Sequence, residues 1–325
     1  MNIVFMGTPD FAKESLEALY NKGYKILAVV TNPDKPQGRG MKLTASPVKQ
    51  FAIEKGLEVY QPTKIRNNNE FIEKIKSLSP DLLCVVAYGK ILPKELLDIP
   101  DKGAINVHGS LLPKYRGAAP IQWAVINGDK TTGITTMYMN EGMDTGDMIL
   151  KKEIDILPDE TTGELWNRLS KIGADLLVET VKKIEKGEAP REKQPEEGTM
   201  APMLSKDMAK IEWNKPAIEI KNLIRGLNPI LGAYSYIEDK KIKIWKSDDI
   251  DIKNFIDKFE NKIDEHEISK LEPGTIIIAD PKKGLYIQTS DGILSVLEIQ
   301  GENAKKMDIT SFLRGNKLTE YSIFK

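Results

Sequence analysis

The first half of the chain alternates short, almost uninterrupted apolar runs with amphipathic stretches. This alternation constrains the fold more than any other feature. The runs NIVFM (2–6), KILAVV (25–30) and DLLCVVAY (81–88) have the length of strands, and the stretches between them have helical spacing. Strands that are apolar on both faces belong to parallel sheets covered by helices. The sequence therefore predicts an α/β fold with a doubly wound, mostly parallel sheet.

The same pattern indicates the extent of the first domain. A strand at 105–108, a helix at 119–128 and a strand at 134–139 continue it, and a helix expected over 161–185 closes it. The next residues are charged, contain proline and lack periodicity, which is typical of a linker. We therefore predict an N-terminal domain at 1–188 and a linker at 189–207.

The last part of the chain has a different character. Between 208 and 325 several short β-rich runs are separated by turn signals such as PKKG and SDG, a pattern that favours a smaller β-barrel of the OB type. The stretch near 247–270 has helical spacing and contains eight Asp or Glu residues and four Lys residues. We expect this acidic segment to be a solvated surface elaboration.

Bulk properties exclude several classes of protein. The 325 residues carry a net charge of −1, so the basic excess that is typical of many nucleic-acid binders is absent. No apolar run approaches the roughly 20 residues that span a membrane, and we expect no signal peptide. One cysteine excludes an internal disulfide, and with only two histidines a zinc site is disfavoured. We expect a cytoplasmic protein that binds neither metal nor membrane.

Polar residues at strand ends are the candidate chemistry. Asn106 and His108 lie two apart at the end of a predicted strand, so their side chains share one face. Asp144 lies in a glycine-rich loop, EGMDTGD. The residues after Gly7 lack the dinucleotide fingerprint, and neither a Walker sequence nor a GxSxG elbow is present. Taken singly, each polar residue is also compatible with a structural role.

Three blocks of the sequence resemble the folate-dependent formyltransferase family. The stretch NVHGSLLPKYRGAAPIQWAVINGD (106–129) is similar to the Asn-x-His strand and Ser-Leu-Leu-Pro turn of that family, and AYGKILP (87–93) and EGMDTGDMI (141–149) resemble its other blocks. The start GTPDFA, the loop NPDKPQGRGMKLTASPVK and the distal end of the chain resemble the members that act on methionyl-tRNA. The resemblance runs nearly end to end and implies a formyltransferase-type sheet. The acidic stretch near 247–270 departs from the family pattern and looks like an insertion.

The resemblance implies an activity. It is the transfer of a formyl group from 10-formyltetrahydrofolate to the free amino group of methionyl initiator tRNA, for translation initiation. Attack of the amine on the formyl carbon places negative charge on the formyl oxygen, so hydrogen-bond donors must face that oxygen. Asn106 and His108 supply N–H groups, and Asp144 orients the imidazole or holds a relaying water. These three residues are the expected catalytic set.

The resemblance also implies binding residues for both substrates. The folate is expected to contact Ser110, Leu111, Leu112 and Pro113, with its pterin near Tyr88, Ile91 and Leu92. Loop 33–49 carries an excess of three positive charges and is expected to reach the tRNA through Lys35, Arg39 and Lys42. A second patch, Lys240, Lys241, Lys243 and Lys246, has two interpretations: a tRNA contact or the solvated face of a strand. We expect a monomer.

Other functions stay open at this stage. A formyltransferase acting on an amino sugar nucleotide, or a formyl-folate hydrolase, would share the catalytic half. A glycinamide ribonucleotide formyltransferase would leave the last part of the chain unexplained. A non-catalytic tRNA-binding protein would not need Asn106, His108 and Asp144 together.

Overall fold

The computed structural model describes residues 1–37, 42–259 and 265–325. These residues form two compact units. Unit 1 comprises residues 1–121, 131–155 and 165–203. Unit 2 comprises residues 122–130, 156–164 and 204–325.

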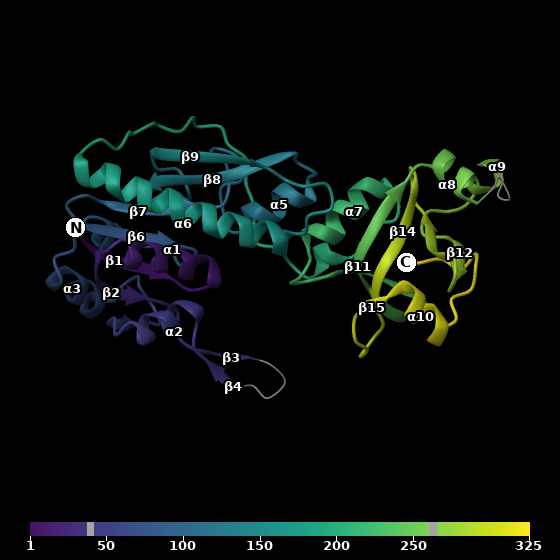
Figure 1. Cartoon of the computed structure of the whole chain (residues 1–325), viewed down its shortest axis with the longest axis horizontal. Helices are drawn as coiled ribbons and strands as arrows, with labels where there is room; N and C mark the ends of the chain where they lie inside the picture. Colours follow the sequence, from purple (N-terminus) through teal and green to yellow (C-terminus); the bar gives the residue numbers. More distant parts are fainter. Residues whose placement is uncertain (38–41, 260–264) are drawn as a thin grey trace. The chain divides into compact units, whose positions relative to one another are not determined.

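Unit 1 is built on a seven-stranded sheet with the order β5-β2-β1-β6-β7-β8-β9 (Figure 1). The strands are β1 (Asn2–Gly7), β2 (Lys25–Val30), β5 (Val59–Tyr60), β6 (Leu82–Val86), β7 (Ala104–His108), β8 (Thr131–Tyr138) and β9 (Met148–Asp155). The pairs from β5 to β7 are parallel, and β8 and β9 add antiparallel strands at one edge. The predicted mostly parallel α/β sheet is therefore confirmed, whereas the sequence does not predict β9. The strand includes three consecutive exposed positions, which weaken its signal.

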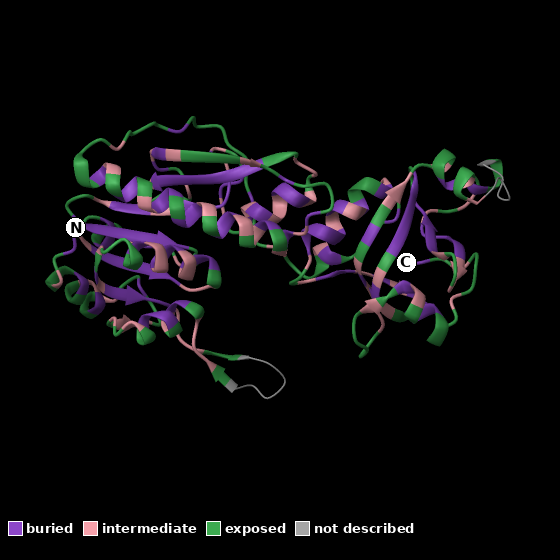
Figure 2. Cartoon of the chain, in the orientation of Figure 1, coloured by how far each residue is buried: buried purple, intermediate pink, exposed green. Residues whose placement is uncertain are grey.

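Helices cover both faces of this sheet, as the continuous burial of β1, β6 and β7 requires (Figure 2). The helices are α1 (Asp10–Asn21), α2 (Pro47–Glu54), α3 (Asn69–Ser77), α4 (Lys94–Leu97) and α6 (Thr162–Lys186). Phe71 of α3 and Leu96 of α4 pack on the face that Val85 and Ala104 share. Gly173 of α6 lies against Phe11 of α1 and Val107 of β7 on the opposite face.

A short hairpin interrupts the polar loop after β2. Its strands are β3 (Lys35–Gln37) and β4 (Lys42–Thr44), and they extend away from the sheet of unit 1 (Figure 1). Lys49 and Asp34 form an ion pair of 2.7 Å at its base, where Gln61 also donates a hydrogen bond of 2.8 Å to Asp34. The sequence predicts only a loop here, because the hairpin strands are three residues long and polar.

The core of unit 2 is an antiparallel sheet with the order β10-β11-β14-β13-β12, and β15 pairs with β14. Its elements are β10 (Ala233–Ile237), β11 (Lys240–Ile250), β12 (Ile276–Asp280), β13 (Gly284–Gln288), β14 (Ile293–Gln300), β15 (Met307–Asp308), α7 (Ala217–Gly226), α10 (Ile309–Gly315) and the single-turn helix η1 (Asp207–Ala209). The last residues connect its two edges, since Lys325 exchanges backbone hydrogen bonds with Tyr236 of β10, and Tyr321 and Ser322 bond to Ile276 of β12. The barrel-like antiparallel domain predicted from the sequence is present.

Two segments from the first half of the sequence pack into unit 2. Helix α5 (Pro120–Ile126) contributes Ile126 to the core of this unit, where it lies against Gly226. Arg225 donates hydrogen bonds to the carbonyl oxygens of Glu160, at 3.0 Å, and Val125, at 3.5 Å. The contacts of unit 2 therefore begin well before residue 208.

The acidic segment also buries apolar side chains. Helices α8 (Ile252–Lys258) and α9 (Glu265–Ile268) follow β11, and residues 260–264 lie outside the described part of the chain. Phe255 and Ile268 are buried in a cluster with Tyr286 of the sheet. The segment is therefore anchored by its own small core and is more than a solvated elaboration.

The expected linker 189–207 forms backbone hydrogen bonds with a loop of unit 1. The backbone N–H of Arg116 donates to the carbonyl of Thr199 at 2.8 Å, and the N–H of Ala201 donates to the carbonyl of Arg116 at 2.7 Å. Gln194 is buried. Residues 194–201 thus lie along the loop that follows β7, although their sequence lacks periodicity.

Candidate active site

The end of β7 carries two polar side chains on one face of the sheet. Strand alternation directs Asn106 and His108 to the face of α3 and α4, opposite Val107. Asn106 is half-buried, and its carboxamide makes no hydrogen bond to any described residue. His108 is 5% exposed.

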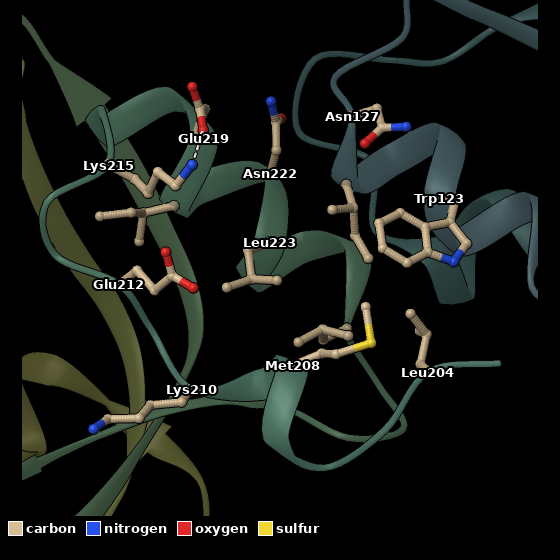
Figure 3. Close-up of a pocket in the computed structure, with 13 residues that line it drawn as sticks. Trp123, Asn127, Leu204, Met208, Lys210, Glu212, Lys215, Glu219, Asn222 and Leu223 are labelled. Atoms are coloured by element: carbon tan, nitrogen blue, oxygen red, sulfur yellow. Dashed lines mark ion pairs between the residues drawn. The ribbon is translucent and has the colours of Figure 1, made fainter. Parts of the chain in front are cut away.

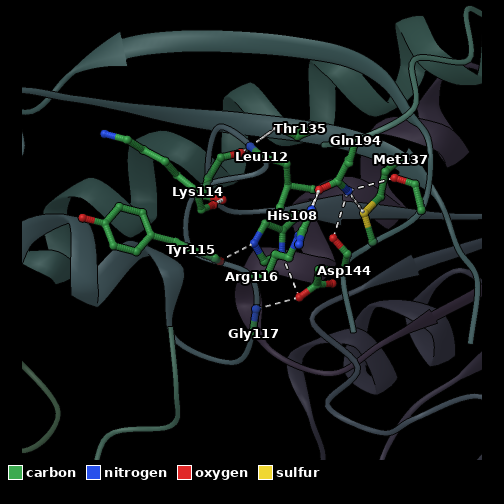
Figure 4. A network of polar contacts seen from close by, with 12 residues as sticks. His108, Leu112, Lys114, Tyr115, Arg116, Gly117, Thr135, Met137, Asp144 and Gln194 are labelled. Atoms are coloured by element: carbon green, nitrogen blue, oxygen red, sulfur yellow. Dashed lines mark hydrogen bonds and ion pairs between the residues drawn. The ribbon is translucent and has the colours of Figure 1, made fainter. Parts of the chain in front are cut away.

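His108 is held by a backbone carbonyl. Its Nε2 lies 2.8 Å from the oxygen of Tyr115, and because a carbonyl only accepts hydrogen bonds, Nε2 carries a proton and donates it (Figure 4). The other ring nitrogen, Nδ1, lies 3.6 Å from Oδ2 of Asp144. Nδ1 is therefore the ring nitrogen that is free of the backbone and lies toward the carboxylate.

Asp144 reaches the histidine from the loop between β8 and β9. Its backbone is in the left-handed region, with φ of 53°. The N–H of Gly117 donates to its Oδ2 at 2.8 Å, and the side chain of Gln194 donates to its carbonyl oxygen at 2.9 Å. The carboxylate and the backbone of Asp144 are thus each held by a separate contact.

Three consecutive residues link these groups. Tyr115 accepts the hydrogen bond from His108, Gly117 donates to Asp144, and the side chain of Arg116 extends between them to Gln194 (Figure 4). Gly117 has a φ of 122°, and a Cβ placed there would meet the carbonyl oxygen of Ala201 at 2.8 Å. Glycine is therefore required at this position by both conformation and space.

The Ser110–Pro113 turn is fixed by hydrogen bonds with Thr135 of β8. The hydroxyl of Thr135 donates to the carbonyl of Ser110 at 2.7 Å and accepts from the N–H of Leu112 at 3.1 Å. The side chains of Ser110 and Leu112 are buried, whereas Leu111 and Pro113 are partly exposed. A ligand at this turn would meet backbone groups and the partly exposed side chains.

The loop after β6 carries the three residues that are expected near the pterin. Ala87 and Gly89 have positive φ angles of 45° and 75°. The side chain of Asn32 donates to the carbonyl of Tyr88 at 2.9 Å, and the Tyr88 ring is buried with a hydroxyl that has no described partner. Ile91 is 74% exposed and Leu92 is buried. Both line a cavity of about 660 Å³ in unit 1, which also includes Glu141.

A second cavity, of about 640 Å³, lies within unit 2 (Figure 3). Trp123, Met208 and Leu223 form part of its apolar wall, and an ion pair between Lys215 and Glu219 lies at its edge. None of the site residues predicted from the sequence lines this cavity.

Of the predicted tRNA-binding residues, only Lys35 has a described side chain. Lys35 is exposed on β3. Arg39 lies outside the described residues, as does the side chain of Lys42. On the sheet of unit 2, Lys243 donates to the carbonyl of Leu231 at 2.7 Å, and Lys241 lies 3.5 Å from the ring centre of Tyr234.

Several residues that surround the predicted catalytic set, directly or through Gln194, are absent from the sequence-based prediction. Tyr115, Arg116 and Gly117 lie inside the motif that carries the family resemblance, so their position was available as a signal. Gln194 had no such signal, because it lies in a charged, aperiodic stretch.

Sequence comparisons identify the family. A model of the formyl transferase family matches residues 1–181, and a model of the formyl transferase C-terminal domain matches residues 203–317. The chain is 48% identical to methionyl-tRNA formyltransferase of Caldanaerobacter subterraneus subsp. tengcongensis over 100% of both chains. It is 50% identical to the enzyme of that name from Clostridioides difficile over 98% of each. The chain belongs to the methionyl-tRNA formyltransferase family. It is thus a formyl-transferring enzyme.

Solved structures share the fold of this family member at lower identity. An N-formyltransferase from Helicobacter canadensis, solved with folinic acid and dTDP-3-aminofucose, has a TM-score of 0.64 and 18% identity, and the match covers 90% of this chain and 98% of that one. HypX from Aquifex aeolicus has a TM-score of 0.64 and 14% identity over 98% of this chain and 49% of that one.

Neither a membrane-spanning helix nor a metal-binding cluster occurs in the described residues. No helix in residues 1–37, 42–259 and 265–325 is both long and apolar enough to cross a membrane. Within the same residues, no group of three or more His, Cys, Asp and Glu side chains is arranged to hold a metal ion.

Proposed function

We propose that this enzyme transfers a formyl group from 10-formyltetrahydrofolate to the amino group of methionyl initiator tRNA, for translation initiation. The observation that carries the proposal is the identity of 48–50% to methionyl-tRNA formyltransferases over essentially the whole chain. The approach of Asp144 to His108 supports it independently, because it brings an acid–base pair to the end of one strand.

Formyl transfer needs donors for a developing negative charge. As the amine nitrogen bonds to the formyl carbon, the formyl oxygen becomes an oxyanion. Nε2 of His108 is already committed to Tyr115, so a proton on Nδ1 is the one that His108 presents to this oxygen. The contact of Nδ1 with Asp144, at 3.6 Å, is too long for a hydrogen bond and leaves that proton available. Asn106 offers a second N–H donor on the same face.

The reaction also moves one proton. The amine loses a proton as the new C–N bond forms, and the nitrogen of tetrahydrofolate gains one as its bond to the formyl carbon breaks. Asp144 is anchored by Gly117 and is positioned to accept the first proton directly or through water. His108 lies beside it and is suited to deliver a proton to the leaving nitrogen.

We propose that the folate binds between two segments. Ser110, Leu111, Leu112 and Pro113 would contact it mainly through the backbone, since two of these side chains are buried. Tyr88, Ile91 and Leu92 would hold the pterin, and the cavity beside Ile91 and Leu92 supports this assignment. A structural relative with the same fold was solved with folinic acid.

We propose that the hairpin contacts tRNA through Lys35, Arg39 and Lys42. Asp34 is the only acidic residue of loop 33–49, and Lys49 neutralises it. The exposed side chain of Lys35 is one positive charge that could meet phosphates, which position a nucleic acid without reading its sequence. Binding should weaken with salt.

The remaining assignments are also proposals. We divide the chain into a catalytic domain (1–188), a connecting segment (189–207) and a tRNA-binding domain (208–325). We place the protein in the cytoplasm, where translation supplies its substrate. The monomeric state stays a prediction from the sequence.

The test offers the purified protein 10-formyltetrahydrofolate with methionyl-tRNA or with a dTDP-amino sugar, and measures formylated product. We expect product only with methionyl-tRNA. Product with the sugar alone would contradict the proposal and favour the sugar N-formyltransferases, which share the fold at 18% identity. Binding of tRNA without any product would favour a non-catalytic tRNA-binding protein.

A further inference from the structure

Arg116 and Gln194 are buried polar residues with no part in the proposed chemistry. Arg116 is 7% exposed and Gln194 is 6% exposed. The guanidinium donates at 3.1 and 2.9 Å to Oε1 of Gln194 and at 2.8 and 3.2 Å to the carbonyl oxygens of Pro195 and Glu196. Burying a guanidinium and an amide is costly unless their hydrogen bonds are satisfied, and here four hydrogen bonds of the guanidinium satisfy it. Such a specific set of partners points to a role beyond packing.

The amide of Gln194 joins two loops. Its Oε1 accepts both hydrogen bonds from Arg116, and its Nε2 donates to the carbonyl oxygens of Asp144, at 2.9 Å, and Gly146, at 2.8 Å (Figure 4). One side chain therefore fixes loop 115–117 relative to the Asp144 loop. The orientation of the amide follows from its partners, because a guanidinium only donates and carbonyls only accept.

The two loops hold the two ionisable residues of the site. Loop 115–117 binds His108 through Tyr115 and Asp144 through Gly117. We propose that Gln194, with Arg116, is a positioning residue that sets the separation of His108 and Asp144. This inference rests on the proposed function. It makes the stretch between the two domains a structural part of the active site.

Two substitutions separate the roles of the Gln194 amide. Gln194→Met removes both sets of hydrogen bonds, whereas Gln194→Glu keeps the acceptor for Arg116 and removes the donor to Asp144 and Gly146. We expect both variants to lower kcat by on the order of 10²-fold with KM for both substrates unchanged, because misplacement of about 1 Å has that effect. A Gln194→Glu variant with wild-type kcat would overturn the proposal.

A buried polar residue elsewhere in unit 1 provides the matched control. Thr180 of α6 is fully buried and shares a 2.8 Å hydrogen bond with Thr136. Thr180→Val should lower the melting temperature without changing kcat of the folded enzyme. If Thr180→Val lowers kcat as much as Gln194→Met, the effect is one of general stability and the proposal fails.

A double-mutant cycle asks whether Gln194 acts through Asp144. Asp144→Asn keeps an oxygen for the N–H of Gly117 and removes the charge. In that background Gln194→Met should cause less than about a twofold further loss in single-turnover rate, because coupled residues are not additive. A loss equal to that in the wild-type background would overturn the proposal.

A spectroscopic readout is independent of turnover. The chain has two histidines, so the ring signals of His108 are assigned by comparison with His266→Gln. Gln194→Met and Gln194→Glu should shift the His108 ring signals, whereas Thr180→Val should not. Unshifted signals in both Gln194 variants would overturn the positioning role. A shift without formylation of tRNA by the wild-type protein would show that the proposed function alone had failed.

Discussion

Nδ1 of His108 lies 3.6 Å from Oδ2 of Asp144, although one residue ends β7 and the other lies in the loop between β8 and β9. Antiparallel pairing places the end of β8 beside the start of β7, with Tyr138 opposite Ile105, so the loop after β8 has to fold back along β7 to reach His108. The pair therefore depends on the path of that loop, which is held by the contacts of Gly117 and Gln194 with Asp144.

Replacement of the histidine tests the catalytic set. We expect His108→Gln to keep the fold and to lower kcat by on the order of 10²–10³-fold, the effect of losing one donor to an oxyanion. Single-turnover rates and circular dichroism measure the two quantities. His266→Gln, at an exposed position of α9, is the matched control and should keep full activity. A near-normal rate for His108→Gln would remove His108 from the mechanism.

A single methyl group at Gly117 should damage the site. The φ of 122° opposes Gly117→Ala, and so does the carbonyl oxygen of Ala201, which lies 2.8 Å from the position that the new Cβ would take. We expect a loss of about 1–3 kcal/mol in the free energy of unfolding, together with reduced kcat. Gly187→Ala is the control, because Gly187 has a φ of 72° with nothing within 4 Å of its Cβ position. Equal effects on kcat in the two variants would contradict this prediction.

The hairpin should contribute to tRNA binding through charge. We expect Arg39→Ala and Lys35→Ala each to raise KM for methionyl-tRNA and to reduce the slope of log K against log salt by roughly one unit or less. Folate binding should not change. Lys102→Ala, at an exposed position between α4 and β7, serves as the control. A dependence on tRNA concentration that is the same as in the wild type would count against the role of the hairpin.

The ion pair at the base of the hairpin predicts a dependence on pH. The hydrogen bond from Lys49, followed by that from Gln61, holds the pKa of the Asp34 carboxyl below its usual value. Ionised Asp34 therefore stabilises the fold above its unfolded-state pKa of about 4, and this contribution is lost as the pH falls through the folded-state pKa. We expect Asp34→Asn to lower Tm at about pH 7 and the difference to shrink below about pH 4. A difference in Tm that is independent of pH would contradict this assignment.

The single cysteine should report unfolding. Burial raises the pKa of the Cys84 thiol, so the thiol stays protonated in the folded protein. We expect no reaction with a thiol reagent at neutral pH until denaturant unfolds unit 1. Rapid labelling of the folded protein would show that β6 is more accessible than its burial indicates.

The order of most helices and strands in unit 1 could be predicted from the sequence, because it depends on local patterns. The apolar runs at β1, β2 and β6 identify a buried parallel sheet before any contact is known. The shared face of Asn106 and His108 follows from strand alternation alone. Family motifs then indicated Asp144 as their partner, although no local pattern brings a loop residue to a strand end.

The remaining elements and contacts depend on tertiary structure. The sequence does not predict β9, because three consecutive exposed residues interrupt its apolar run. It does not predict the hairpin either, because the strands β3 and β4 are short and polar. The path of residues 194–201 beside the active-site loop could not be predicted from their charged sequence. Local sequence by itself determined most of the helices and strands of unit 1 and which side chains share a face. Only the folded chain decided that Gln194 and Arg116 reach the Asp144 loop, because hydrogen bonds between segments distant in sequence depend on position in space and leave no periodic pattern along the chain.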